Sequence, residues 1–167
     1  MYQTGDRVVY GNNGICRVEK VDVPDFETFE RGKPYYFLRC EADESRIYAP
    51  VDTHIPMRAL MNQAEAQALL TDLSQLPVQL PSGRDHKTIS LHYQKILQQH
   101  TPNAMACVIK SIYLRHRGSD GALGRMTSAE EGLLKKTEAQ LCLELSAALG
   151  VSPEQARERL IAVIREK

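Results

Sequence analysis

The hydrophobic pattern of this chain changes period once, near residue 53, and that change constrains the fold more than any other feature. Before it, apolar and polar residues alternate in short runs rich in β-branched and aromatic side chains, as in half-buried strands. After it, apolar residues recur every three or four positions, as in amphipathic helices. The 167-residue chain is therefore predicted to be α+β, with a small antiparallel β-module followed by an all-α helical bundle.

Turn-forming residues divide the first part into four expected strands. These occupy residues 7–10, 14–23, 33–41 and 46–49. In the third, Tyr36, Leu38 and Cys40 fall on one face, and the residues between them fall on the other. Several short strands within about fifty residues predict a small curled sheet or partial barrel.

Capping residues indicate where the later helices begin. Asn62 is followed at three residues by Glu65, and Thr127 by Glu130, which is the spacing of a capping box. Pro102 suits the first turn of another helix. A last helix is expected after Ser152, where Ser-Pro-Glu-Gln supplies a cap.

A proline- and glycine-containing stretch at residues 76–83 is expected to connect two parts of the chain. The predicted organisation is a β-domain at 1–53, a helix and connector at 54–83, and a helical domain at 84–167. Residues 118–124 are expected to form a glycine-containing loop.

The four cysteines do not have the close spacing of a zinc knuckle. Each lies in an apolar run, so reduced thiols in the core are expected at Cys16, Cys40, Cys107 and Cys142. The N-terminus lacks the pattern of a signal peptide, and no apolar run is long enough for a membrane span. We therefore expect a cytoplasmic protein without membrane contact.

Charge is balanced overall, with 21 basic and 21 acidic residues, but it is unevenly distributed. Residues 84–125 contain seven basic residues against only Asp85 and Asp120, with four of the five histidines among them. Such a segment is a candidate phosphate-facing surface. The same charges also suit the solvated faces of ordinary amphipathic helices, and Arg115 to Arg117 lie where cations favour a helix C-terminus.

No motif of an enzyme is present in the sequence. It has no nucleophile elbow, no phosphate-binding glycine loop with lysine, and no closely spaced histidines and carboxylates. We therefore expect no catalytic activity, no cofactor and no metal site.

Three segments, in order, resemble the CarD/CdnL family of bacterial transcription regulators. Gly5-Asp-Arg-Val-Val-Tyr10 leads into a turn ending at Gly14, Tyr35-Tyr-Phe-Leu-Arg39 is similar to the family's Tyr-Tyr-x-Leu strand, and Ile47-Tyr-Ala-Pro-Val-Asp52 is similar to its Val-Pro-Val-Asp segment. The resemblance implies a Tudor-like β-barrel domain that docks on the β subunit of RNA polymerase. It also implies a helical domain that contacts promoter DNA weakly and without sequence specificity, which stabilises the open promoter complex.

The resemblance also suggests which residues would make these contacts. An arginine that some relatives present to polymerase falls on Tyr48, with Arg46 on the same strand face, so Arg39, Arg46 and Tyr48 are the predicted polymerase contacts. Relatives use a tryptophan as a wedge against the minor groove, whereas this chain has no Trp and Asp85 stands at that position. The predicted DNA contacts are Arg84, His86, Lys87, Lys95, Arg115, Arg117 and Arg125.

Two other functions fit the sequence. Residues 145–156 resemble the turn of a helix-turn-helix regulator, although acidic residues begin the helix that would read the DNA. Alternatively, the chain is an adaptor that binds polymerase and never contacts DNA, which the missing tryptophan favours. For the oligomeric state, we expect a monomer.

Overall fold

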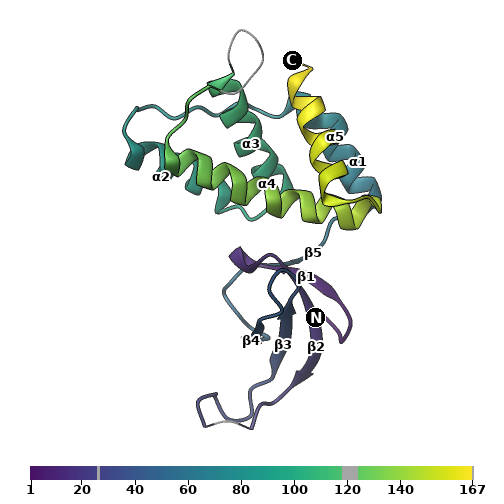
Figure 1. Cartoon of the computed structure of the whole chain (residues 1–167). Helices are drawn as coiled ribbons and strands as arrows, with labels where there is room; N and C mark the ends of the chain where they lie inside the picture. Colours follow the sequence, from purple (N-terminus) through teal and green to yellow (C-terminus); the bar gives the residue numbers. More distant parts are fainter. Residues whose placement is uncertain (26, 118–123, 167) are drawn as a thin grey trace. The chain divides into compact units, whose positions relative to one another are not determined.

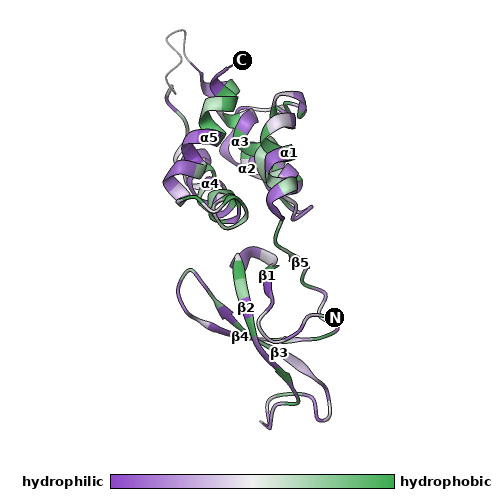
Figure 2. Ribbon diagram, turned by 90° about the vertical axis from the view of Figure 1, so that its right-hand side faces the viewer, coloured by the Kyte–Doolittle hydropathy of each residue, from purple (hydrophilic) through white to green (hydrophobic). Residues whose placement is uncertain are grey.

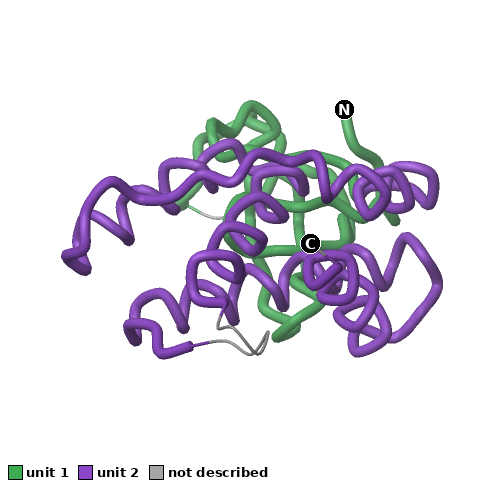
Figure 3. Tube along the Cα trace, turned by 90° about the horizontal axis from the view of Figure 1, so that it is seen from above, with its two compact units in different colours: residues 1–60 green, residues 61–167 purple. Residues whose placement is uncertain are grey.

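The computed structural model describes residues 1–25, 27–117 and 124–166. The chain forms two compact units, residues 1–60 and residues 61–167, which Figure 3 shows in separate colours. The expected loop at residues 118–124 lies, except for Gly124, outside the described part.

The first unit is a five-stranded antiparallel sheet with the order β4-β3-β2-β1-β5 (Figure 1). Its strands are β1 Arg7–Tyr10, β2 Ile15–Asp22, β3 Tyr35–Cys40, β4 Arg46–Pro50 and β5 Met57–Ala59. The pairing order makes β4 and β5 the two edge strands. The α+β prediction is confirmed.

The inner face of this sheet forms a core of its own. Tyr36, Leu38 and Cys40 are buried there as the alternation in β3 predicts, together with Val8 and Val18 from the neighbouring strands. The core is small because it is formed by one face of a short sheet.

Strand β5 was not expected from the sequence, and it moves the boundary of the first unit. It pairs with β1, with Val9 opposite Arg58, so the β-unit extends to Leu60 rather than ending at residue 53. The helix that follows packs with the later helices, so it belongs to the second unit and not to a separate connector.

The described residues of the second unit form five α-helices. They are α1 Gln63–Asp72, α2 His86–Leu97, α3 Pro102–His116, α4 Ser128–Leu149 and α5 Pro153–Arg165. Each helix carries both hydrophilic and hydrophobic residues, as amphipathic helices do (Figure 2). Most of α3 is buried, and its residues Ile109 and Ile112 are fully enclosed.

The caps form largely as the sequence predicts. Capping boxes are present at Asn62 of α1 and Ser152 of α5, and Pro102 occupies the first turn of α3. The expected box at Thr127 forms only in part: Thr127 accepts from the Glu130 backbone, but the Glu130 carboxylate turns to other partners. None of the described helices is long and apolar enough to cross a membrane.

Candidate functional site

The outer face of the sheet brings the three predicted polymerase contacts together. In the register of β3 with β4, Arg39 lies opposite Arg46 and Phe37 lies opposite Tyr48. Alternation within each strand therefore places all four side chains on the face away from the core. Tyr48 is exposed on this face.

Aromatic rings form a continuous cluster on this face. Phe37 and Tyr48 meet edge to face with ring centroids 4.9 Å apart, and Phe29 contacts Tyr48 at 5.5 Å and Tyr35 at 4.9 Å. The ammonium of Lys20 lies 4.5 Å from the Phe37 ring centroid, a cation–π contact. The cluster is a rigid apolar platform, because aromatic side chains have few rotatable bonds.

Charged groups surround the platform, and most are paired within the sheet. A β-bulge between Val18 and Lys20 adds Glu19 to β2, and its carboxylate accepts a hydrogen bond from Arg39 at 2.5 Å. Lys20 pairs with Asp22 at 3.6 Å. Arg46 is exposed and has no ion pair with any described residue.

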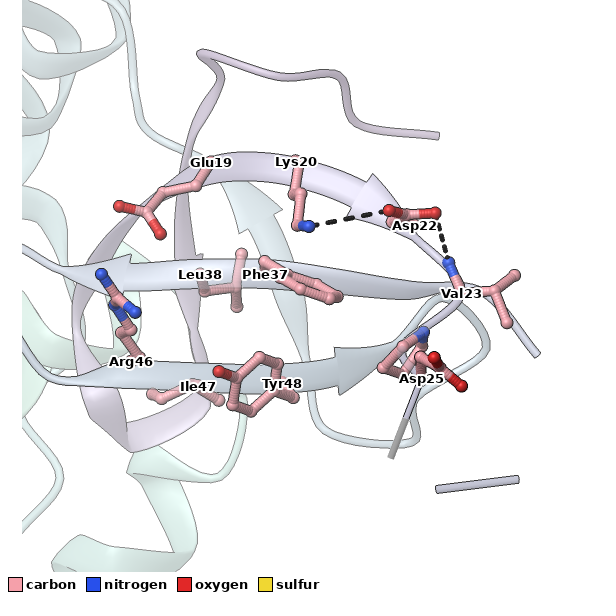
Figure 4. Close-up of a pocket in the computed structure, with 11 residues that line it drawn as sticks. Glu19, Lys20, Asp22, Val23, Asp25, Phe37, Leu38, Arg46, Ile47 and Tyr48 are labelled. Atoms are coloured by element: carbon pink, nitrogen blue, oxygen red, sulfur yellow. Dashed lines mark hydrogen bonds and ion pairs between the residues drawn. The ribbon is translucent and has the colours of Figure 1, made fainter. Parts of the chain in front are cut away.

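Phe37 and Tyr48 of this platform line an open hollow of about 470 Å³, together with other residues of β2, β3 and β4 and the segment after β2. Figure 4 shows Phe37 and Tyr48 side by side beneath it, with Arg46 at one end and Asp22 and Asp25 toward the other. A surface with an aromatic floor, an unpaired arginine and a charged rim has the composition of a protein-binding site.

The comparison with known proteins identifies this unit. The CarD-like/TRCF RID family matches residues 2–60, which is nearly the whole β-unit. Residues 2–60 form a CarD-like/TRCF RID domain. The RID of this family is an RNA polymerase-interacting domain, so the match supports RNA polymerase as a partner and a role in transcription regulation. Among curated proteins, none matches the chain.

The sequence indicated part of the outer face of the RID domain and missed the rest. Arg39, Arg46 and Tyr48 were predicted, and the structure places them together. Phe29 and Phe37 were not predicted as part of the polymerase contact, although Phe37 occupies an outward-facing position in the alternation of β3. Phe29 lies in the β2–β3 connection, and no local pattern indicates that this segment folds onto the sheet.

The predicted DNA contacts of the second unit fall into two groups. Four belong to α2 or the residues just before it and are exposed: Arg84, His86, Lys87 and Lys95. In α2, Lys87 and Lys95 are two turns apart, with the exposed Leu91 midway between them on the same face. Asp85 is the N-cap of this helix, and hydrogen bonds from the Thr88 side chain and backbone lower the pKa of its carboxyl group.

The other three predicted DNA contacts, Arg115, Arg117 and Arg125, lie near the end of α3 and before the start of α4. Two of them have partners inside the unit. Arg115 donates to Glu130 at 3.1 Å, and His116 lies 2.6 Å from the same buried carboxylate. Arg117 donates to the Arg165 carbonyl at 3.0 Å. Arg125 is exposed in the segment before α4.

Lys110, which contributes to the positive charge of residues 84–125, is buried. Its ammonium donates to the carbonyls of Leu73, Ser74 and Leu76 at 2.7–3.0 Å. Lys110 is therefore not available to an outside partner, whereas Arg84, Lys87 and Lys95 are exposed on α2 or just before it.

Proposed function

We propose that this protein binds the RNA polymerase β subunit through the outer face of its RID domain and promoter DNA through the basic face of its helical unit. The DNA contact is weak and independent of base sequence. Together the two contacts stabilise the open promoter complex. The observation that carries the proposal is the RID match over the unit on which Arg39, Arg46 and Tyr48 share one face with an aromatic hollow.

The polymerase contact is supported by the chemistry of this face. Aromatic residues and arginine are enriched at the centres of protein interfaces, and Arg46 has no ion pair among the described residues. An acidic group of the partner would pair with Arg46 while apolar side chains cover Phe37 and Tyr48. The β3 and β4 backbones hold these groups in place before binding, which limits the entropy lost.

The DNA contact is supported by the exposed cations of α2. Lys87 and Lys95 project from one helix face, and Arg84 precedes the helix, so they suit the phosphates of a duplex backbone. Lysines bind phosphate without reading base edges, which agrees with binding that does not depend on sequence. The helix-turn-helix alternative is less well supported, because the exposed residues of α5 include Glu154 and Glu158.

Stabilisation of the open complex follows from linkage. A protein that binds polymerase on melted promoter more tightly than polymerase on closed promoter shifts the equilibrium by its difference in affinity. The polymerase contact raises the local concentration of the helical unit near the DNA, so a weak phosphate contact is enough.

Variants of the outer face test the polymerase contact. Arg46→Glu and Tyr48→Ala should each weaken binding to purified polymerase by about tenfold or more, because they remove an arginine and an aromatic anchor from one interface. Binding is measured by biolayer interferometry with immobilised polymerase core. Arg159→Glu, an exposed change of the same charge on α5, is the matched control and should bind normally.

The outcomes separate the candidate functions. Unchanged binding by both outer-face variants, with native circular dichroism, would place the polymerase contact elsewhere on the RID domain. Normal polymerase binding with no stabilisation of promoter complexes by the wild-type protein would favour the adaptor.

A further inference from the structure

Two of the four buried cysteines face each other across the sheet. Cys16 of β2 and Cys40 of β3 are direct partners in the strand register, and their sulfur atoms are 3.2 Å apart. Both thiols are free, and their exposures are 0% and 3%. Sequence spacing gives no sign of this pair, because the cysteines are 24 residues apart.

The backbone geometry at this pair suits a covalent crosslink. The Glu41 backbone N–H donates to the Ile15 carbonyl at 3.0 Å, whereas the Cys40 N–H donates to Ser45 on the other side of β3. Cys16 and Cys40 are therefore a non-hydrogen-bonded pair, the type whose Cα atoms approach to about 4.5 Å. This separation lies within the range found for disulfides, at about 4.4–6.8 Å.

We propose that Cys16 and Cys40 are an oxidation site, at which a hydroperoxide or a low-molecular-mass disulfide converts the two thiols into an intramolecular disulfide. With a hydroperoxide, one thiolate attacks the O–O bond to give a sulfenic acid and releases an alcohol or water. The second thiol then displaces water from the sulfenic sulfur and forms the S–S bond. The two cysteines lose two protons and two electrons, which reduce the peroxide.

The position of the pair in the strands gives it a route to an oxidant. Cys40 is the last residue of β3 and Cys16 the second residue of β2, so both lie beside turns, where strands open most readily. Burial is the main cause that raises the pKa of the Cys16 thiol to about 12, and its contact with Cys40 adds to this effect. The closed sheet therefore protects the thiols, and opening of the strand ends limits the rate of oxidation.

The other two cysteines provide internal controls. The Cys107 thiol donates to the Pro77 carbonyl at 3.1 Å, and burial raises the pKa of Cys142 to about 11. Both are buried and free like the pair. Neither has a thiol opposite it among the described residues. If buried cysteines were oxidised in general, all four thiols would react alike, whereas the proposed site predicts that only Cys16 and Cys40 react.

The crosslink would join β2 and β3, which carry much of the outer face. Both cysteines lie on the inner face of the sheet, so the disulfide would form on the side away from the outer-face residues. Since it constrains a segment of 24 residues in the unfolded chain, the oxidised protein should melt about 5 °C or more above the reduced protein. The outer-face side chains Arg39 and Phe37 stay in place on β3, so polymerase affinity should change by no more than about twofold.

The experiment treats the full-length protein with hydrogen peroxide or oxidised glutathione under native conditions. Remaining thiols are then alkylated, and mass spectrometry measures the product. We expect a mass about 2 Da lower than that of the reduced protein before alkylation, two alkyl groups instead of four after it, and a Cys16–Cys40 peptide in the non-reduced digest. A variant with Cys107→Ser and Cys142→Ser should form the same crosslink, and Cys16→Ala should not.

Three results would overturn the proposal. One is four alkylated cysteines in wild-type protein after prolonged oxidation. The second is a stable mixed disulfide with glutathione at Cys40 without closure onto Cys16, and the third is crosslinking through Cys107 or Cys142. Because these readouts are made on wild-type protein, the conclusion does not depend on whether Cys16→Ala folds, and it is independent of polymerase binding.

Discussion

Lys110 shows how a single buried charge can determine the local structure. Its ammonium donates hydrogen bonds to the carbonyls of Leu73, Ser74 and Leu76, which follow α1. Carbonyls at a helix end lack the N–H of a following helical turn. The Leu73 carbonyl accepts from the Leu76 N–H, and the lysine of α3 donates to all three carbonyls. These hydrogen bonds hold the start of the segment between α1 and α2 against α3.

Replacing this lysine should therefore destabilise the helical unit strongly. In Lys110→Met the three carbonyls lose their donor while the side chain keeps its approximate volume, and we expect a loss of about 3 kcal/mol in unfolding free energy. Urea unfolding followed by circular dichroism measures it. Lys136→Met on the exposed face of α4 is the control and should change stability by less than about 0.5 kcal/mol. A small effect at Lys110 would mean that water replaces the ammonium.

A second residue-scale prediction concerns pH and the ion pair of Glu41. Hydrogen bonds from Arg7 at 2.6 and 2.8 Å lower the pKa of Glu41 below its ordinary value of 4.5. A carboxylate with a lowered folded-state pKa stabilises the native state above the unfolded pKa, and this contribution is lost as pH falls through the folded pKa. Melting temperatures between about pH 7 and 3 should therefore fall more steeply for the wild type than for Glu41→Gln.

The control for this experiment is Glu27→Gln, an exposed residue without an ion pair among the described residues. Its melting curve should follow the wild type across the whole pH range. If Glu41→Gln also follows the wild type, the Arg7 contact contributes nothing to stability in solution.

At the scale of the element, α4 has two glycines whose replacement by alanine should change stability in opposite directions. Gly132 lies within the helix and Gly150 ends it with φ +69°, and a Cβ at either position would meet open space. Gly132→Ala should stabilise the protein by about 0.5–1 kcal/mol because glycine is a poor helix former. Gly150→Ala should destabilise it by about 1 kcal/mol because alanine is strained in the left-handed region. Thermal unfolding of both variants measures the difference, and equal signs would contradict the assignment of the cap.

The elements also show what the sequence can predict and what it cannot. The box at Asn62 forms as expected because both partners lie within four residues, so no distant contact decides it. The box at Thr127 forms only in part because Arg115 and His116, from another helix, draw the Glu130 carboxylate away. Strand β5 has three residues and no alternating pattern, and it is a strand only because β1 offers an edge for pairing.

The candidate site divides in the same way. The alternation in β3 is local, so it indicates which of its residues face outward. The neighbours of those residues depend on register, which the bulge at Glu19 shifts by one residue between β2 and β3. Both the Arg39–Glu19 contact and the position of Lys20 over Phe37 depend on that bulge, so sequence alone did not reveal them.

For the whole molecule, the decisive property is that the two units have separate hydrophobic cores. One core draws on residues of the sheet unit and the other on residues of the helical unit, with no residue in common. A chain built in this way can present two surfaces of different chemistry, because each unit is stable through its own packing. The aromatic outer face of the RID domain and the basic face of α2 belong to different units.

The remaining prediction concerns the DNA contact and its dependence on salt. If Arg84, Lys87 and Lys95 each neutralise one phosphate, the logarithm of the binding constant should fall with the logarithm of salt concentration at a slope of about −2.7. Affinity for any duplex would then drop about 40-fold between about 50 and 200 mM salt. Fluorescence anisotropy with a promoter duplex and a scrambled duplex measures both the slope and the absence of sequence preference.

Two double variants assign that slope to α2. Lys87→Gln with Lys95→Gln should reduce its magnitude by about 1.8, because two counterion-releasing contacts are removed. Lys135→Gln with Lys136→Gln removes the same charge from exposed positions of α4 and should leave the slope unchanged. A slope that neither pair alters would remove α2 from the DNA interface and favour the polymerase adaptor. A strong preference for one duplex would instead favour a regulator that reads base sequence, since phosphate contacts alone do not discriminate between sequences.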